Sequence, residues 1–326
     1  MNASVPDTDP VLFDILLADG FVLTELAGVV DVLRLCNRIS AREVFRWQYL
    51  SRAGQTVQSS SDAVVQSNVL SHRPEGAYLF VLGNADPDHP DLAVAGVVSA
   101  YKARQATVVL LAEAAGRHIA DTSDMDTPHT THWENRAVLA ERIGLMDSRA
   151  ALAVVEGNII TAAGMGATFD LTLSLAARHV SSATLMTVAD ILLHERIRHH
   201  NTLQPFSGRS TVTTGDRDLD ACISLMQDHI EHPLAISQIA DHASVSKRSL
   251  ERKFNRILGI TPNGYYREIR LSRANNLLLN TDMKIREIGL ACGFPSGFTA
   301  VYRDTFGMTP QAARLQGLQT HQKRQS

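Results

Sequence analysis

The feature that most constrains this 326-residue chain is an internal repeat near its C-terminus. The two copies share the patterns Ile236-x-x-Ile239-Ala240 and Ile285-x-x-Ile288-Gly289, which lie 49 residues apart. In the first copy, Phe254 is followed by Gly259-Ile260-Thr261-Pro262. The same pattern recurs 48 residues later as Tyr302 followed by Gly307-Met308-Thr309-Pro310. The difference of one residue predicts a shorter turn in the second copy. Self-similarity at such a spacing marks a repeated supersecondary unit, so the chain must build the same small structure twice.

Each copy has the pattern of two short helices joined by a tight turn. In the first copy, apolar residues at helical spacing mark the buried side of one helix: Ile236, Ile239, Ala240 and Ala243. Ser244-Val245-Ser246 interrupts this stripe, and Ser246 is the expected N-cap of a second helix. The second helix has a buried stripe of Leu250, Phe254, Ile257 and Leu258 and an outer face of Arg248, Glu251, Arg252 and Asn255.

A helix that is packed on one side and basic on the other fits the major groove of DNA, which is about as wide as a helix with its side chains. A surface helix in an ordinary bundle has the same short pattern, so one copy alone does not decide between the two. Two copies on one connector can reach successive major-groove segments, about 34 Å apart on one DNA face. We expect that connector to be a helix from Asn263 to Leu279 that starts after Thr261-Pro262. It would carry Arg267, Arg270 and Arg273 along one side.

The two copies are predicted to contact DNA unequally. The candidate contacts of the first copy are Lys247, Arg248, Ser249, Glu251 and Arg252, and those of the second are Ser296, Thr299 and Arg303. Arginines near the start of a groove helix reach base edges, which favours the first copy. Arg303 lies a full turn into its helix and is expected to reach only phosphate, which positions a protein without reading the base sequence.

The distribution of charge agrees with a nucleic-acid partner for this end of the chain. From Asp216 onward there are 15 Lys and Arg against 11 Asp and Glu, a net charge of +4. The preceding part has 16 basic and 23 acidic residues, a net charge of −7, so the whole chain carries −3. Basic charge is densest from Lys247 to Arg273, with eight basic residues and two acidic ones.

The preceding part of the chain alternates between strand and helix patterns. Val11–Ala18 is a nearly continuous apolar run, typical of a strand buried on both faces, and Thr24 is the expected N-cap of the next helix. Further strands are predicted at 45–51, 78–82 and 107–111, with a hairpin over 152–161 and helices at 92–104, 133–143, 165–178 and 182–199. This alternation indicates an α/β domain with a doubly wound, mostly parallel sheet, followed by an all-α domain with two helix-turn-helix motifs.

The length suggests two domains. The expected segments are an N-terminus without fixed structure at 1–10, the α/β domain at 11–200, a linker at 201–216, the helical domain at 217–316 and a disordered tail at 317–326. The linker is placed there because the stretch is rich in Ser, Thr, Gly and Pro.

The sequence gives no indication of a membrane, a metal or a cofactor. No apolar run approaches the roughly 20 residues of a membrane span, and Met1–Pro10 does not resemble a signal peptide. The three cysteines, Cys36, Cys222 and Cys292, lie far apart in helical patterns, as expected of buried thiols in a reducing cytoplasm. The 13 histidines lack metal-ligand spacing. We therefore expect a cytoplasmic protein with no cofactor.

The last hundred residues resemble the AraC/XylS family of transcription regulators. The resemblance is carried by Ser246-x-x-x-Leu250-x-Arg252-x-Phe254, Ile288-Gly-x-Ala-Cys-Gly293-Phe294 and Phe306-Gly-Met-Thr-Pro310. It implies promoter DNA and RNA polymerase as partners. The second turn departs from the family pattern by two residues, and Ala300 stands where relatives often carry a long polar side chain.

The first domain resembles the PfpI-like, class I glutamine-amidotransferase-like domain of the GlxA group of AraC regulators. The matching residues are Thr130-Thr131-His132-Trp133, Asn158–Gly164 and His194-Glu195-Arg196-Ile197-Arg198. The resemblance implies that enzymatic relatives carry a cysteine at the elbow after a central strand, where Ala112 stands here. It also implies a glutamate at the start of the first helix, a position that Glu25 takes. The segment Gly116–Pro128 departs from the family pattern.

Ligands of such sheets bind beyond the carboxyl ends of the strands, which directs attention to the loops at 19–25, 83–86 and 112–114. The candidate effector-binding residues are Glu25, Asn84, Ala112, Glu113, His132 and Trp133. Four of these residues also have a purely structural interpretation: Glu25 at a helix N-terminus, Asn84 in a turn, and His132 with Trp133 in core packing. An acid at the mouth of the pocket, Glu25, and the aromatic face of Trp133 favour a cationic or zwitterionic amine.

We predict a homodimeric transcription regulator that responds to a small-molecule effector. The resemblance implies an activator of a catabolic operon for a nitrogenous metabolite, either an amino acid or a quaternary amine. One alternative is a hydrolase or glyoxalase with an appended DNA-binding domain. The elbow at Ala112-Glu113-Ala114 has no Ser, Cys or Thr to act as nucleophile, which opposes that alternative. A second alternative is a ligand-independent DNA-binding protein whose first domain only dimerises.

Overall fold

The computed structural model describes residues 9–71, 73–122, 127–135, 139, 151–204 and 214–323. The chain divides into two compact units, Met1–Thr202 and Leu203–Ser326. Most of the expected linker, most of the expected helix at 133–143 and all but two residues of the N-terminal segment lie outside the described residues. Among the described residues, no helix is both long enough and apolar enough to cross a membrane.

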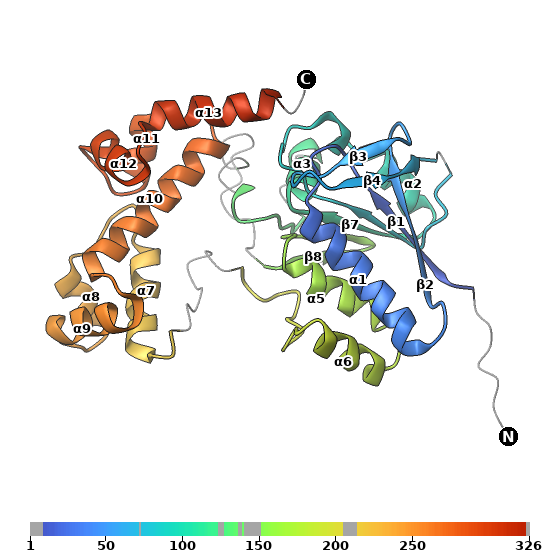
Figure 1. The fold of residues 1–326 in the computed structure, drawn as a ribbon, viewed down its shortest axis with the longest axis horizontal. Coiled ribbons are helices and arrows are strands. Elements are labelled where there is room, and N and C mark those ends of the chain that lie inside the picture. Colours follow the sequence, from blue (N-terminus) through green and yellow to red (C-terminus); the bar gives the residue numbers. More distant parts are fainter. Residues whose placement is uncertain are drawn as a thin grey trace. The chain divides into compact units, whose positions relative to one another are not determined.

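The first unit contains the mostly parallel sheet that the sequence predicts (Figure 1). Within the described residues, seven strands pair in the order β5-β2-β1-β6-β7-β9-β8, and only β8 and β9 pair antiparallel. The strands are β1 (Val11–Leu16), β2 (Phe45–Ser51), β5 (Asn68–Val69), β6 (Tyr78–Val81), β7 (Thr107–Leu111), β8 (Ala153–Glu156) and β9 (Ile159–Ala162). A separate antiparallel pair is formed by β3 (Thr56–Gln58) and β4 (Val64–Gln66).

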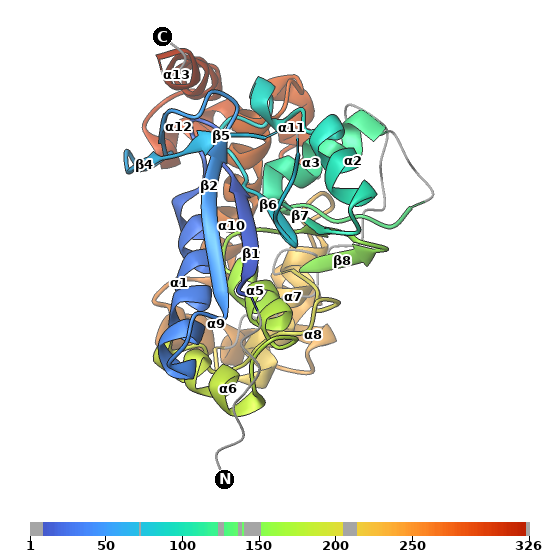
Figure 2. The ribbon, with the colours of Figure 1, turned by 90° about the vertical axis from the view of Figure 1, so that its right-hand side faces the viewer.

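Helices cover both faces of this sheet, and the central strands β6 and β7 are accordingly apolar and buried on both sides (Figure 2). One face packs against α1 (Leu23–Ser40), α5 (Ala167–Ala176) and α6 (Ser182–Ile191). The other packs against η1 (Pro90–Leu92), α2 (Ala95–Ala103) and α3 (Ala112–Thr122). The helix expected at 92–104 is therefore a short 3-10 turn followed by α2.

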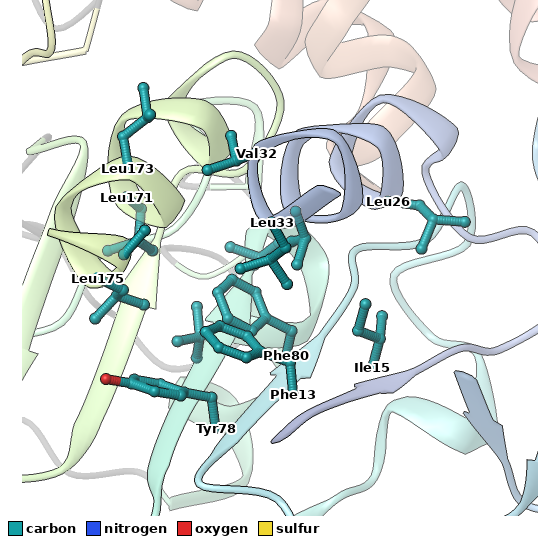
Figure 3. Close-up of a cluster of buried hydrophobic side chains, with 14 of the residues drawn as sticks. Phe13, Ile15, Leu26, Val32, Leu33, Tyr78, Phe80, Leu171, Leu173 and Leu175 are labelled. Carbon is teal, nitrogen blue, oxygen red and sulfur yellow. The ribbon is translucent and has the colours of Figure 1, made fainter. Parts of the chain in front are cut away.

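Alternate side chains of the central strands form the two cores. Phe13 and Phe80 point toward α1 and α5, where their rings lie 5.9 Å apart among leucines (Figure 3). Tyr78 stacks on Phe13 at 4.5 Å between ring centroids. Burying each such ring contributes roughly 2–3 kcal/mol. The strands β1, β6 and β7 thus occupy the middle of the sheet, and their carboxyl ends lie at one edge.

Two helix boundaries in this unit were predicted wrongly. Helix α1 begins at Leu23 with Val22 as its cap, instead of after Thr24, because the Val22 N–H donates to the Gly83 carbonyl at 3.1 Å and fixes the loop earlier. Helix α6 ends at Ile191 instead of His199. It stops because Leu193 takes a left-handed conformation, with φ of 53°.

The second unit is helical, as predicted, and contains both copies of the repeat. Its helices are α7 (Arg217–Asp228), α8 (Ile236–His242), α9 (Lys247–Leu258), α10 (Pro262–Asn280), α11 (Ile285–Ala291), α12 (Phe298–Phe306) and α13 (Pro310–Lys323). Figure 1 shows α10 running from the group of α7, α8 and α9 to the group of α11, α12 and α13. The predicted caps are confirmed: Ser246 accepts from the Ser249 N–H at 3.2 Å, and Thr261 accepts from the Gly264 N–H at 3.1 Å.

The turn of the second copy is longer than that of the first, which corrects the prediction of a shorter turn. It covers 292–297, whereas the first turn covers 243–246. Helix α12 begins at Phe298, the counterpart of Leu250, so it lacks the first turn that α9 has. The reason is local: Pro295 disfavours helical geometry at the preceding residue, and Gly297 is left-handed with φ of 72°.

The C-terminal tail also differs from the expectation. Helix α13 runs on to Lys323, although the sequence predicts disorder from Gly317. Its composition of Gln, Ala, Leu and Arg favours a helix. Arg314 holds the helix against the end of α10 by donating to the carbonyls of Leu278 at 3.2 Å and Met283 at 2.7 Å.

Two left-handed glycines of the second turn provide a matched test of its packing. A Cβ at Gly293 would lie 2.5 Å from Pro233 Cγ and 2.6 Å from the Ile230 carbonyl, whereas a Cβ at Gly297 would meet nothing within 4 Å. Both Gly→Ala variants incur about 1–2 kcal/mol of backbone strain. Gly293→Ala should be destabilised by about 1–3 kcal/mol more through the steric clash.

The measurement is hydrogen exchange of α11 and α12 amides in the full chain, followed by mass spectrometry. An equal decrease of protection in the two variants would contradict the close approach at Gly293.

Candidate functional site

Helix α9 presents a basic, exposed face above a buried one. Leu250 and Phe254 are fully buried against α7 and α8. On the opposite face, the predicted contacts Lys247, Arg248, Glu251 and Arg252 are exposed, and Ser249 is half-buried beside its cap. The structure therefore brings all five predicted residues of the first copy together in the first turns of α9.

One basic residue of α9, Lys253, was not among the predicted DNA contacts and has a structural role. Lys253 turns inward and forms ion pairs of 2.7 Å with both Asp216 and Asp218. Asp216 is also the N-cap of α7, where it accepts from the Leu219 N–H at 3.1 Å. These contacts hold α9 against the start of α7, and they leave the outer face of α9 to the other basic residues.

The second copy offers fewer polar groups. Thr299, Ala300 and Arg303 are exposed on α12, and Ser296 lies in the turn before it. These residues line a surface depression together with Arg286, from the first turn of α11. Arg286 was not among the predicted DNA contacts. It could have been predicted, because it is a basic residue at the position that Ser237 holds in the first copy.

The three arginines of α10 do not share one side, which corrects the prediction. Arg267 is exposed, whereas Arg270 and Arg273 are half-buried. Residues at a spacing of three turn through about 300° of a helix, so each lies about 60° from the last. From Arg267 to Arg273 the direction of the side chains therefore changes from the solvent toward the protein.

The elbow after β7 has the geometry that the sequence predicts. Ala112 follows the strand directly, starts α3 and has a left-handed φ of 42°. Two loop glycines leave room for its methyl group: a Cβ at Gly83 would lie 3.0 Å from that methyl carbon, and a Cβ at Gly164 would lie 2.8 Å from it. The carboxyl ends of β6, β7 and β9 therefore converge on Ala112.

Glu25 lies beneath this elbow and not at the mouth of a pocket, which corrects the prediction. Its side chain is inaccessible to solvent. Its two carboxyl oxygens accept from the Gly83 N–H at 2.7 Å and the Met165 N–H at 3.1 Å. Burial, with the nearby charge of Glu113, raises the pKa of Glu25 to about 8. The carboxyl group thus joins the loops after β6 and β9 to the first turn of α1.

Glu113 forms the second acid of the site. Its carboxylate accepts from the Asn84 N–H at 3.1 Å and from Asn135 Nδ2 at 3.3 Å. Burial raises its pKa, although the hydrogen bonds and nearby His132 act in the opposite direction. The Asn84 side chain accepts from the Asp86 N–H at 2.8 Å within its own loop and donates to the Asp19 carbonyl of the loop after β1 at 2.7 Å. The bond to Asp86 matches the turn-shaping interpretation of Asn84, and the bond to Asp19 joins the two loops.

His132 and Trp133 lie half-buried on the segment beside the elbow, with ring centroids 5.5 Å apart. His132 Nδ1 lies 3.3 Å from Glu134 Oε2. The preceding Thr131 hydroxyl donates to the Ala112 carbonyl at 2.6 Å, which ties this segment to the elbow. The six predicted effector residues therefore all lie around one elbow, although three of them are buried.

A small cavity lies on the outer side of Glu113. Its walls are Pro87, Glu113, Gly116, Arg117, Ala120, Asn135 and Leu139. The volume is about 20 Å³, enough for about one water molecule. Any larger ligand would have to displace its walls.

A buried acid on α5, Asp170, was not predicted from the sequence. Asp170 is 3% exposed and accepts from His194 Nε2 at 2.8 Å, from the Arg198 N–H at 2.6 Å and from Arg198 Nε at 2.9 Å. This network holds residues 194–198 against α5 in a non-helical conformation. His194 and Arg198 belong to the matched family motif, and the structure gives them this packing task.

Comparison with known proteins extends these observations. Residues 239–316 match the family model described as a helix-turn-helix domain. The chain is 31% identical to the HTH-type transcriptional regulator CdhR of Pseudomonas aeruginosa, over 93% of this chain and 91% of CdhR. It is 28% identical to the regulator GlxA of Rhizobium meliloti, over 96% of this chain and 98% of GlxA. A crystal structure of an AraC family regulator from Pseudomonas putida is 23% identical, covers 56% of this chain and 100% of that chain, and has a TM-score of 0.48.

Glu25→Gln should remove a pH dependence from the stability of the first unit. The folded protein holds a proton on Glu25 up to a pKa of about 8, whereas the unfolded chain releases it near the ordinary value of 4.5. The resulting stabilisation is complete below pH 4.5 and is lost as the pH rises through 8. Since one pKa unit corresponds to about 1.4 kcal/mol, the wild type should lose on the order of 2–4 kcal/mol between pH 5 and 8 that the variant does not lose.

Urea unfolding can be followed by fluorescence, since Trp47 and Trp133 both lie in the first unit. Glu43→Gln changes an exposed acid of the same unit and should follow the wild type. Parallel pH profiles for Glu25→Gln and the wild type would show that Glu25 does not hold this proton.

Proposed function

The chain belongs to the GlxA-type group of the AraC/XylS family of transcription regulators, and on this premise we propose that it is an effector-responsive activator that reads promoter DNA chiefly through α9. One observation carries the proposal. The first turn of α9 is complete and basic, whereas α12 lacks the corresponding turn. Base edges in the major groove are reached from the start of a recognition helix, so only α9 offers long side chains there.

The second helix-turn-helix copy then acts mainly as a clamp on the DNA backbone. Arg303 lies beyond the start of α12, and Arg286 lines the same depression from α11. Cations at the edge of a groove contact phosphates, which add affinity and salt dependence without sequence information. Ser296 and Thr299 are short and add little reach. Arginine and glutamate on α9 can instead bond directly to guanine and cytosine.

The remaining partners follow from the family. A regulator of promoters acts on RNA polymerase, and we propose that this chain does so as a homodimer. We propose the first unit as the sensor and dimerisation domain.

We place the effector site on the outer side of the elbow, at Glu113, His132 and Trp133. Glu25 is too deeply buried to face a ligand, but Glu113 borders the small cavity and Trp133 is partly accessible. An acid beside an aromatic ring attracts a cation. The effector is therefore proposed to be a cationic or zwitterionic amine, such as an amino acid or a quaternary amine.

Two other functions are the alternatives. A hydrolase or glyoxalase needs a nucleophile at the elbow, and Ala112 presents a methyl group there. A ligand-independent regulator is the second candidate, and the small volume of the cavity favours it. Detection of a saturable effector would exclude that candidate.

The DNA-reading proposal predicts different effects for two arginines. Arg252→Ala should weaken binding and relax specificity at particular bases, by about 1–3 kcal/mol for each bidentate bond to a base that is removed. Arg303→Ala should weaken binding evenly across sequences and reduce the salt slope by about one unit. The measurement is binding of both variants to a library of DNA sites at several salt concentrations.

Arg34→Ala, an exposed arginine of the first unit, is the control and should leave binding unchanged. If Arg303→Ala relaxes specificity at defined bases and Arg252→Ala does not, the second copy and not the first recognises the bases, which contradicts the proposal.

The effector proposal is tested with amines that raise the melting temperature of the intact protein. A panel of amino acids and quaternary amines supplies the probes, and calorimetry measures the affinity of those that stabilise. Trp133→Leu should reduce affinity by roughly 0.5–2 kcal/mol, and Glu113→Gln should reduce it for cations but not for neutral analogues. Glu43→Gln is the control. Unchanged affinity in both Trp133→Leu and Glu113→Gln would contradict the placement of the effector site at this elbow.

A further inference from the structure

Arg270 lies on the connecting helix α10 and turns away from solvent. Its guanidinium carbon Cζ lies 4.4 Å from the centroid of the Phe294 ring and 5.4 Å from that of the Tyr266 ring. Its Nη1 donates to the Gly293 carbonyl at 3.0 Å. A guanidinium group is planar, so it can lie on a ring face and still donate from its edge. One cationic group thus contacts residues that belong to different helix-turn-helix units.

Each of the two rings is fixed to its own helix-turn-helix copy. Tyr266 is 4% exposed, and its hydroxyl donates to the His229 carbonyl at 2.6 Å and accepts from the Leu234 N–H at 3.3 Å. That loop leads from α7 into α8 of the first copy. In the second copy, the Phe294 N–H donates to the Gly289 carbonyl at 2.7 Å. The Phe294 ring lies 5.7 Å from that of Phe298, the first residue of α12.

The two helix-turn-helix copies also touch directly beside Arg270. The missing side chain of Gly293 allows the second turn to approach the loop before α8, where a Cβ would lie 2.5 Å from Pro233 Cγ. The second turn is therefore held between this loop and α10. A contact of this kind restricts how the two copies can rotate about the connecting helix.

An arginine on α10 could instead contact a DNA phosphate. Arg267 is exposed and suits that task. Arg270 is half-buried, and among the described residues its Nε atom is buried without a hydrogen-bond partner. Its Nη1 is engaged by the Gly293 carbonyl. The environment of Arg270 is thus that of a group that acts inside the protein.

We propose that Arg270 is a positioning residue for DNA recognition, which fixes α12 relative to α9 and thereby fixes which phosphates the second copy contacts, counted from the bases that α9 reads. The inference rests on the proposed function, because it requires that both helix-turn-helix copies bind one DNA site. A rigid pair of copies contacts phosphates at one distance from those bases, about one helical turn away. A loosened pair can contact phosphates over a range of distances.

The test uses the full chain and DNA sites selected by the wild type from a random library. One site is then made with single phosphates of the second segment replaced in turn by uncharged methylphosphonates, and also as a site with the first segment alone. Arg270→Met keeps the aliphatic stem but removes the planar cation. Arg267→Ala changes the exposed arginine three residues earlier and is the matched control.

For the wild type, neutral phosphates in the second segment should weaken binding by about threefold or more at a few adjacent positions and leave it unchanged at the others. For Arg270→Met, no single position in the second segment should cost more than about 1.5-fold, with about tenfold weaker binding to the complete site and unchanged binding to the first segment alone. Arg267→Ala should weaken binding to the complete site and keep the wild-type positions in the second segment. Arg270→Lys should lie between Arg270→Met and the wild type, since an ammonium can donate but cannot lie flat on the rings.

Unchanged sensitive positions in the second segment of Arg270→Met would overturn the proposal, as would equally weakened binding to the complete site and to the first segment alone. If circular dichroism shows that Arg270→Met does not fold, Phe294→Leu removes one ring contact and leaves the arginine in place. It should remove the sensitive positions as well, and their retention would also overturn the proposal. Failure of the wild type to enrich any sequence would contradict the proposed function itself, and this inference with it.

Discussion

The helical unit depends on the packing of both helix-turn-helix copies against one helix, α10. Tyr302 of the second copy bonds to Asn275 of α10 at 2.5 Å, and Tyr266 of α10 bonds to the loop before α8 at 2.6 Å. Because α10 is continuous from Pro262 to Asn280, these contacts place α9 and α12 at a defined separation. The position of α12 relative to α9 and the proposed role of Arg270 both follow from this constraint.

The first unit shows how an elbow can persist without a nucleophile. Glu25 bonds to the loops after β6 and β9, and Ala112 has a left-handed backbone above it. A buried carboxyl group with both oxygens bonded stabilises three loops that lie far apart in the sequence. The geometry of the elbow therefore serves packing in this chain, while Glu113 and Trp133 remain beside it for a proposed ligand.

Patterns local in sequence predicted the fold well, and contacts between distant segments explain the errors. Ser246 and Thr261 act as the predicted caps, because a cap depends on the three residues that follow it. The burial of Glu25 depends on Gly83 and Met165, which no local pattern connects to it. Likewise, the inward turn of Arg270 depends on Phe294. The late start of α12 had a local signal in Pro295 and Gly297, but alignment of the repeats alone obscured it.

Methylation interference on the complex with its selected DNA site tests unequal readout most directly. A methyl group on guanine N7 in the major groove blocks an arginine contact to that base. The account predicts that interfering guanines lie in only one of two groove segments, while phosphate modification interferes in both. Comparable guanine interference in both segments, or interference confined to the segment bound by α12, would contradict the assignment of base recognition to α9.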